Sequence, residues 1–234
     1  MSRRVTVAAL FDIDGTLIAR NSAPLYMRHL RRTGQARRRD MARTLYYLVR
    51  YKLGLLDVDR ALAASLDWVR GKREATLAAD CLEWYARVVR PYVYPAMAAT
   101  VEAHRRAGHV PAILTSATRY LAEPLAADLH IEHVLVTQLV VRDGYFTGEA
   151  VRPVCYGLGK IHWARRFADA QGIDLSRSYF YTDSITDIPV LERVGNPRVV
   201  NPDPRLRRAA QRRGWPVAQL RLEQAAAPVL ALGV

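Results

Sequence analysis

The chain has 234 residues, half of them hydrophobic, and a formal net charge of +13 at pH 7. This length and composition are those of a globular protein with one large domain, or with one domain that carries an insertion. Cys81 and Cys155 are far apart and form no CxxC pair, which argues against a zinc site or a disulfide framework. We expect two buried, reduced thiols. Neither end of the chain resembles a secretory signal or a membrane span, so we expect a cytoplasmic protein.

The first predicted element is a mostly apolar strand over residues 5–11. Such a run indicates a strand that is buried on both faces of a parallel sheet. Asp12 and Asp14 follow it, and side chains two positions apart in an extended segment point to the same side. Two carboxylates this close repel each other unless a cation lies between them. Without nearby His or Cys the expected cation is Mg²⁺, although the Asp-x-Asp-Gly pattern alone also fits a polar turn or a calcium loop.

Residues 23–89 carry apolar side chains at three- and four-residue intervals and are predicted to form four helices. The helices centre on residues 25–30, 45–49, 62–69 and 77–85. Between Arg20 and Arg90 there are 16 Lys and Arg against 7 Asp and Glu, an excess of 16 − 7 = +9 that holds most of the net charge. This basic segment could attract nucleic acid, anionic lipid or an anionic small substrate, or it could simply be solvated helix surface.

Beyond Pro95, helical and strand patterns alternate, which predicts a parallel sheet with helices on both faces. Helices are predicted over residues 96–107, 120–129, 160–171 and 204–213, with another after Asp187. Strands are predicted over residues 109–115, 133–136, 179–182 and 198–200. Residues 139–147 predict a β-hairpin with Asp143 and Gly144 at its tip.

In sheets of this kind, ligands bind at the carboxyl ends of the strands. Four predicted strands end there in a polar side chain: Asp12, Ser116, Asp183 and Asn201. We therefore expect a site at one edge of the sheet. Ser116 could instead cap the next helix, and Asn201 also fits a turn that precedes the last helix.

These motifs resemble, in order, those of the haloacid dehalogenase superfamily of phosphohydrolases. The first motif is FDIDGTL at residues 11–17, the second is LTS at residues 114–116, the third is Lys160, and the fourth is DSITD at residues 183–187. The resemblance covers nearly the whole chain and is greatest to the phosphoserine-phosphatase-like subfamily IB. It implies an α/β fold, with a doubly wound, Rossmann-like parallel sheet and an inserted all-helical cap. The core would be residues 1–18 and 92–234, and the cap residues 19–91.

By this resemblance, Asp12 is the nucleophile that forms an aspartyl-phosphate, and Asp14 is the general acid and base. Mg²⁺ would be held by the Asp12 carboxylate, the Asp14 main-chain carbonyl and Asp183. Asp187 would lie in the coordination shell or directly behind it.

Ser116 and Lys160 would bind the oxygens of the transferring phosphoryl group, whose negative charge requires fixed donors and cations. Taken alone, a lysine at the start of a helix is more often solvated, so the assignment of Lys160 depends on its register with the aspartate motifs.

The resemblance implies a Mg²⁺-dependent phosphatase that acts on a small phosphorylated metabolite. Phosphoserine, histidinol phosphate and phosphorylated alcohols or lipids are candidate substrates. Asn21 stands where relatives that hydrolyse phosphoserine have an acid for the substrate amine, which weakens the phosphoserine assignment. Residues 20–39 contain seven arginines and no acid, which favours an anionic leaving group if these side chains face the site.

A protein of another class remains an alternative: a non-catalytic protein that binds nucleic acid or an anionic membrane through the basic cap. We rank nucleic acid below a small metabolite as the partner. Transfer of the phosphoryl group to an acceptor other than water is a third hypothesis. The sequence indicates no particular oligomeric state.

Overall fold

The computed structural model of the chain describes residues 6–36, 42, 46, 49–50 and 66–223. Its centre is a six-stranded sheet in the order β3-β2-β1-β6-β7-β8, and every neighbouring pair is parallel. The strands are β1 (Ala8–Phe11), β2 (Val110–Thr118), β3 (His133–Thr137), β6 (Tyr179–Thr182), β7 (Asn196–Val200) and β8 (Val217–Ala218). The predicted doubly wound parallel sheet is confirmed.

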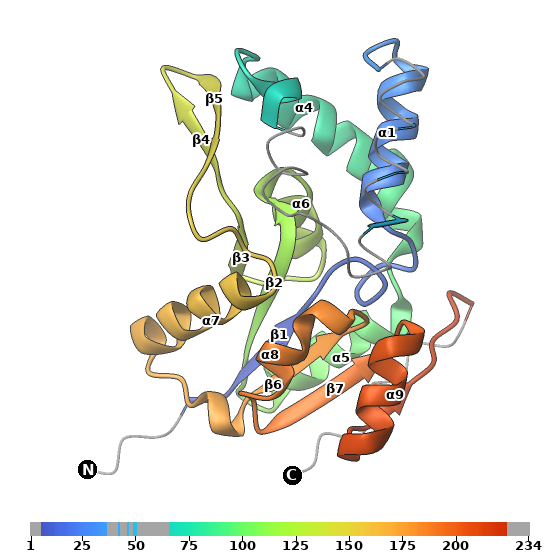
Figure 1. Cartoon of the computed structure of the whole chain (residues 1–234), viewed down its shortest axis with the longest axis vertical. Coiled ribbons are helices and arrows are strands. Elements are labelled where there is room, and N and C mark those ends of the chain that lie inside the picture. The colour runs from blue at the N-terminus through green and yellow to red at the C-terminus, as the bar shows by residue number, and fades with distance from the viewer. Residues whose placement is uncertain (1–5, 37–41, 43–45, 47–48, 51–65, 224–234) are drawn as a thin grey trace.

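Helices cover both faces of this sheet (Figure 1). One face packs on α5 (Pro95–Arg106) and α6 (Arg119–Asp128), and the other packs on α7 (Leu158–Gln171), α8 (Ile188–Leu191) and α9 (Pro204–Arg213). Successive side chains of β1 enter opposite cores: Ala9 and Phe11 lie in one, Ala8 and Leu10 in the other. All four are fully buried, because a central parallel strand has no solvent face.

The observed elements follow the predicted ones closely, and β6 and α9 have the predicted bounds. One difference concerns β2, which was expected to end at residue 115 but continues to Thr118. Its pairing with β3 shifts register between Leu114 and Thr118, so the extension is an irregular continuation of the strand that pairs again with β3 at Thr137.

Above the sheet lie α1 (Ser22–Arg32) and α4 (Glu74–Trp84), which continues into a π-helical turn (Tyr85–Val89) and a 3₁₀ turn (Arg90–Tyr92) (Figure 1). The predicted first and fourth cap helices are thus confirmed. Of the helix predicted at 62–69, the described residues 66–69 are helical, and most of the helix predicted at 45–49 lies outside the described residues.

The predicted hairpin forms from β4 (Leu139–Arg142) and β5 (Tyr145–Ala150), with positive φ at both tip residues, Asp143 and Gly144. It stands apart from the main sheet and packs against the cap segment (Figure 1). Backbone hydrogen bonds join it to the residues just before α4: Gly71 N–H donates to the Phe146 carbonyl at 2.8 Å, and Phe146 N–H donates to the Lys72 carbonyl at 3.0 Å. A third hydrophobic cluster, here called the cap cluster, consists of Leu66, Val69, Leu77, Cys81, Tyr120 and Phe146.

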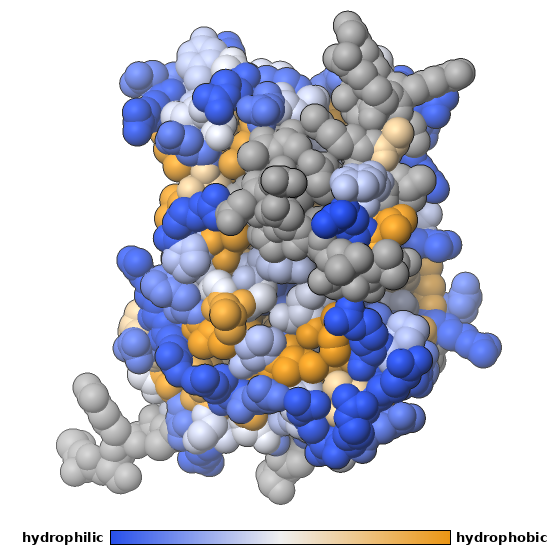
Figure 2. Space-filling view, in the orientation of Figure 1, coloured by the Kyte–Doolittle hydropathy of each residue, from blue (hydrophilic) through white to orange (hydrophobic). Residues whose placement is uncertain are grey.

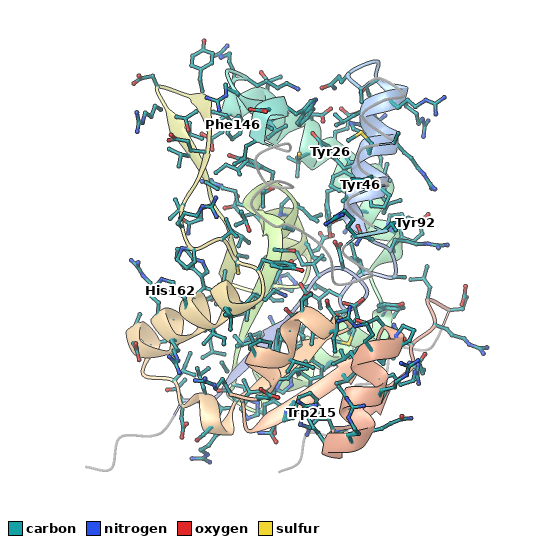
Figure 3. The ribbon with its side chains drawn as sticks, in the orientation of Figure 1. Tyr26, Tyr46, Tyr92, Phe146, His162 and Trp215 are labelled. Atoms are coloured by element: carbon teal, nitrogen blue, oxygen red, sulfur yellow. The ribbon has the colours of Figure 1, made fainter. Side chains whose placement is uncertain are left out.

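Two connecting segments link the sheet to α1 and α4, and they run side by side. Ala19 N–H donates to the Tyr92 carbonyl at 2.8 Å, and Tyr94 N–H donates to the Leu17 carbonyl at 3.0 Å. Tyr92 lies beside the base of α1 in Figure 3. The division into a core and a cap at these connections stays a prediction.

The surface seen in Figure 2 is largely hydrophilic, with smaller hydrophobic patches over the region of α7 and α8. Within the described ranges, no helix combines the length and the apolar character needed to cross a membrane. Cys81 and Cys155 are free and buried, as expected.

Candidate active site

Asp12 lies where β1 leaves the sheet, with its N–H still donating to the Tyr181 carbonyl of β6 at 2.9 Å. The residue is only 7% exposed. One carboxylate oxygen, Oδ1, accepts a hydrogen bond from the next residue's N–H at 2.8 Å, and the other, Oδ2, lies 3.2 Å from Lys160 Nζ. The backbone of the two central strands therefore fixes where this carboxylate points.

Lys160 projects from the first turn of α7 into the interior and is 2% exposed. Its ammonium group donates to Asp187 Oδ2 at 2.7 Å as well as contacting Asp12. Burial alone would lower the pKa of Lys160, but the charges of the two carboxylates outweigh it and raise the pKa above its usual value. The alternative of a solvated lysine is therefore wrong.

Asp187 is held from a third direction, because Thr182 Oγ1 donates to its Oδ2 at 2.6 Å. Burial and the charge of Asp12 raise the pKa of Asp187 to about 6, against the opposing effect of Lys160. Its other oxygen, Oδ1, is buried and has no hydrogen-bond partner among the described residues. A buried acceptor without a donor is rare and suggests a group that binds there.

Asp14 is anchored by the N-terminus of α1. Ser22 donates twice to its carboxylate, from N–H to Oδ1 at 2.9 Å and from Oγ to Oδ2 at 3.0 Å. Burial, and next the charge of Asp12, raise the pKa of Asp14 to about 7, although the Ser22 hydrogen bonds and Lys160 act in the opposite direction. A carboxyl group with this pKa can both give and take a proton near neutral pH.

Asp183 lies against the turn that follows Asp14. Gly15 has a φ of +71°, and a Cβ atom built on it would lie 2.3 Å from Asp183 Oδ2, so only glycine fits here. Burial, followed by the charges of Asp12, Asp187 and Asp14, raises the pKa of Asp183 well above its usual value. The two aspartate motifs are thus brought together, although they are far apart in the sequence.

Ser116 is the least determined of the predicted site residues. Phe11 pairs with Ile113 between β1 and β2, so Ser116 and Asp14 each lie three residues beyond a register pair, at the same edge of the sheet. The Ser116 side chain is exposed. It does not cap α6, because the N-cap position belongs to Thr118, so that alternative is wrong. Its predicted contact with a phosphoryl group stays a prediction.

The charges at this edge are unbalanced in a way that suits Mg²⁺. Four carboxylates and one ammonium group gather here, three of the carboxyl groups have raised pKa values, and Asp187 Oδ1 has no donor among the described residues. A hard divalent cation would supply the missing positive charge, and the available ligands are all oxygen. In the part of the chain that the structure describes, no three His, Cys, Asp or Glu side chains form a metal-binding group. The predicted ligand set needs only two side chains, Asp12 and Asp183, with a main-chain carbonyl of Asp14.

Sequence reasoning missed three residues that shape this site: Ser22, Thr182 and Gly15. Ser22 and Thr182 read as ordinary helix-start and strand residues, and only their distances to the aspartates identify them. The positive φ of Gly15 could have been anticipated from the Asp-Gly turn, but its contact with Asp183 could not.

Asn21 has a local structural task. It is the N-cap of α1, and its side-chain oxygen accepts a hydrogen bond from Ala23 N–H at 3.1 Å. Of the arginines predicted near the cap entrance, Arg20 lies over the Tyr92 ring at 5.6 Å, and Arg28, Arg31 and Arg32 are exposed on α1. The arginines at 37–39 lie outside the described residues.

Related proteins align with nearly the whole chain. A protein of Streptomyces azureus named for inhibition of morphological differentiation is 36% identical over 223 residues, covering 90% of this chain and 77% of that protein. A phosphoserine phosphatase of Mycobacterium tuberculosis is 32% identical, covering 98% and 77%. A histidinol-phosphatase of Neisseria meningitidis serogroup C is 30% identical, covering 89% and 96%.

A solved structure of a protein of unknown function from Bordetella pertussis Tohama I superposes with a TM-score of 0.83 and 32% identity. The match covers 92% of this chain and 98% of that one. The sequence signature of the haloacid dehalogenase-like hydrolases matches residues 9–192, which contain the clustered aspartates and Lys160. The chain therefore belongs to the haloacid dehalogenase-like hydrolase family, as its motifs predicted.

Proposed function

We propose that this protein is a Mg²⁺-dependent phosphoric monoester hydrolase that acts on a small phosphorylated metabolite through an aspartyl-phosphate on Asp12. One observation carries the proposal: three separate segments deliver Asp12, Lys160 and Asp183 to the same edge of the sheet. The phosphatase names of two relatives support the same class of reaction.

Asp12 suits the role of nucleophile because its carboxylate lies beside a buried ammonium group. In the first step an Asp12 oxygen forms a bond to phosphorus while the bond between phosphorus and the leaving oxygen breaks. Lys160 stabilises charge on the phosphoryl oxygens at this stage, and Ser116 would donate to them from the neighbouring strand. In the second step water attacks phosphorus and releases Asp12.

Asp14 suits the role of proton carrier because its pKa is about 7. In its protonated form it gives the proton to the leaving alkoxide, and it then takes one from the attacking water. The two hydrogen bonds from Ser22 hold the carboxyl group in one orientation for both transfers. This contribution is worth about 10²- to 10⁴-fold in rate.

Mg²⁺ would be held by Asp12, the Asp14 carbonyl and Asp183, with Asp187 behind them through its unpartnered oxygen. When bound, the ion would neutralise part of the negative charge of the phosphate and of the aspartates.

The proposed substrates are a subset of the phosphomonoesters. We propose phosphoserine or another phosphorylated alcohol, including histidinol phosphate. The oxygen of Asn21 is used by the helix cap, so a substrate amine would have to be bound by another residue. This favours phosphorylated alcohols whose binding does not require an acidic residue at position 21.

The proposal is tested by incubating the purified full chain with a panel of phosphomonoesters, with Mg²⁺ or with a chelator. We expect phosphate release from at least one substrate, its loss with chelator, and an alkali-labile phosphoprotein after acid quenching. Equal, background release across the panel in the presence of Mg²⁺ would overturn the proposal.

A further inference from the structure

Asn201 follows β7 directly and has a left-handed backbone conformation, with φ of 44°. Asparagine is among the few residues that adopt this conformation readily. The sequence allowed two interpretations of Asn201, as a ligand at the sheet edge or as a turn residue. The residue that caps α9 is Asp203, whose Oδ1 accepts hydrogen bonds from the N–H groups of Arg205 and Leu206. The Asn201 side chain therefore does not cap α9.

The side-chain amide of Asn201 joins three separate segments. Its Oδ1 accepts from Leu220 N–H at 2.7 Å, and its Nδ2 donates to Tyr94 Oη at 2.9 Å, with a longer contact of 3.5 Å to the Gly15 carbonyl. The network fixes the orientation of the amide: a backbone N–H can only donate, so Oδ1 must face Leu220, and a carbonyl can only accept, so Nδ2 must face Gly15.

Both partners of Nδ2 border the proposed metal site. Gly15 lies in the loop that carries Asp12 and Asp14, and it touches Asp183. The turn that begins at Asn201 also holds the Asp183 loop, because Asp203 N–H donates to the Asp183 carbonyl at 3.0 Å and Asp203 Oδ2 accepts from Ile185 N–H at 2.7 Å. One turn thus contacts both aspartate motifs.

The Tyr94 hydroxyl accepts the amide hydrogen of Asn201, so its own hydrogen is left for another acceptor. Burial, and next the charge of Asp183, raise the pKa of Tyr94, so the phenol stays protonated at neutral pH. Asn201 therefore orients a neutral hydroxyl group that lies within electrostatic range of Asp183.

We propose that Asn201 is a positioning residue, whose amide fixes Gly15 and Tyr94 relative to Asp183 and so sets the spacing of the two aspartate motifs. This inference rests on the proposed function, since the spacing matters because Mg²⁺ would join the two motifs. The competing explanation is that asparagine is needed only for the left-handed backbone.

Asn201→Gly separates the two explanations, because glycine keeps the backbone conformation and removes the amide. The matched control is Asn196→Gly at the other end of β7, where the side chain donates to the Arg177 carbonyl at 2.9 Å. A second variant, Tyr94→Phe, leaves the backbone at 201 unchanged and removes only the hydroxyl. Each full-length variant is assayed with p-nitrophenyl phosphate, and its Mg²⁺ affinity is measured by calorimetry without substrate.

We expect Asn201→Gly to lower kcat by about 10-fold or more with little change in KM, because small displacements of reacting groups are costly. We expect its Mg²⁺ affinity to fall by about 10-fold, with a smaller loss in Tyr94→Phe and none in Asn196→Gly. Wild-type kcat and wild-type Mg²⁺ affinity in Asn201→Gly would overturn the inference. If the wild-type chain hydrolyses no phosphomonoester, the proposed function is wrong. The Mg²⁺ titration still tests whether Asn201 positions the two aspartate motifs.

Discussion

The edge of the main sheet and the cap cluster are built on opposite principles. At the sheet edge, four aspartates and Lys160 are brought together by strand ends and by one helix start, and Asp12, Asp187 and Lys160 are all less than 10% exposed. In the cap cluster, apolar and aromatic side chains pack together, and the hydroxyl group of Tyr120 donates to Glu74 at 2.9 Å. Buried charges rarely stabilise a fold, so the first arrangement points to chemistry and the second to packing.

Substitutions in the two regions should therefore have different effects. Each group at the sheet edge is held in place by specific hydrogen bonds, ion pairs or close contacts, so its removal should change the reaction itself. The cap cluster is held by contacts between segments that are distant in the sequence, and Tyr26 packs against it (Tyr26 and Phe146 are labelled in Figure 3). Its disruption should change which substrates are accepted.

The largest effect is expected for Asp12→Asn, which removes the nucleophile and should lower kcat by about 10⁴-fold or more. Lys160 still pairs with Asp187 in this variant, so the fold should persist. Turnover of p-nitrophenyl phosphate and the circular dichroism spectrum are the measurements. Asp169→Asn, on the exposed side of α7, is the matched control and should behave as wild type. Wild-type turnover in Asp12→Asn would exclude the aspartyl-phosphate route.

Asp14→Asn should lower kcat by about 10²- to 10⁴-fold on phosphoserine or histidinol phosphate. Asparagine can still accept the hydrogen bond from Ser22 N–H, so the loop should keep its position. The loss should be smaller on p-nitrophenyl phosphate, because a nitrophenolate leaves without a proton. Equal losses on both kinds of substrate would argue that Asp14 acts on geometry rather than by proton transfer.

Phe146→Ala should change substrate preference by about 10-fold while turnover of p-nitrophenyl phosphate stays near wild type. Phe146 is 2% exposed and lies edge-on to Tyr120, with ring centroids 5.6 Å apart. Its loss should loosen the hairpin against the cap cluster. Relative kcat/KM values for several phosphomonoesters are the measurement, with Tyr145→Ala, at a 47% exposed neighbour, as the control. A uniform loss on all substrates would contradict the division of roles.

The smallest effect concerns stability. The folded protein binds protons at Asp14 and Asp187 more tightly than the unfolded chain, because their pKa values are raised to about 7 and about 6. Without metal, the contribution of these groups to the free energy of unfolding should therefore fall as the pH rises from about 4 to about 7. Mg²⁺ should offset this loss and raise Tm more at pH 8 than at pH 5.

At 100 times its Kd, Mg²⁺ would add about 2.7 kcal/mol, or about 5–10 °C in Tm for a chain of this size. Thermal unfolding with Mg²⁺ and with chelator at both pH values is the measurement. Asp183→Asn should remove most of the gain at pH 8. A gain that is equal at both pH values would be inconsistent with metal binding by these carboxylates.

The parallel sheet, the hairpin and the family could all be predicted from the amino-acid sequence. These follow from local patterns: the apolar run before Asp12 marks a central strand, Asp143-Gly144 specifies a tight turn, and parallel strands place their carboxyl ends at one edge. The placement of Asp12, Asp14 and Asp183 at that edge followed from these short-range rules, while their roles stay predictions.

Which side chains contact one another could not be predicted, because it depends on the three-dimensional fold. The burial of Lys160 between two aspartates, the hold of Ser22 on Asp14, the fit of Gly15 against Asp183 and the packing of the hairpin on the cap cluster all join segments that are far apart in the sequence. Local propensity carries no information on such contacts, because they depend on how helices and loops cross after the sheet has formed.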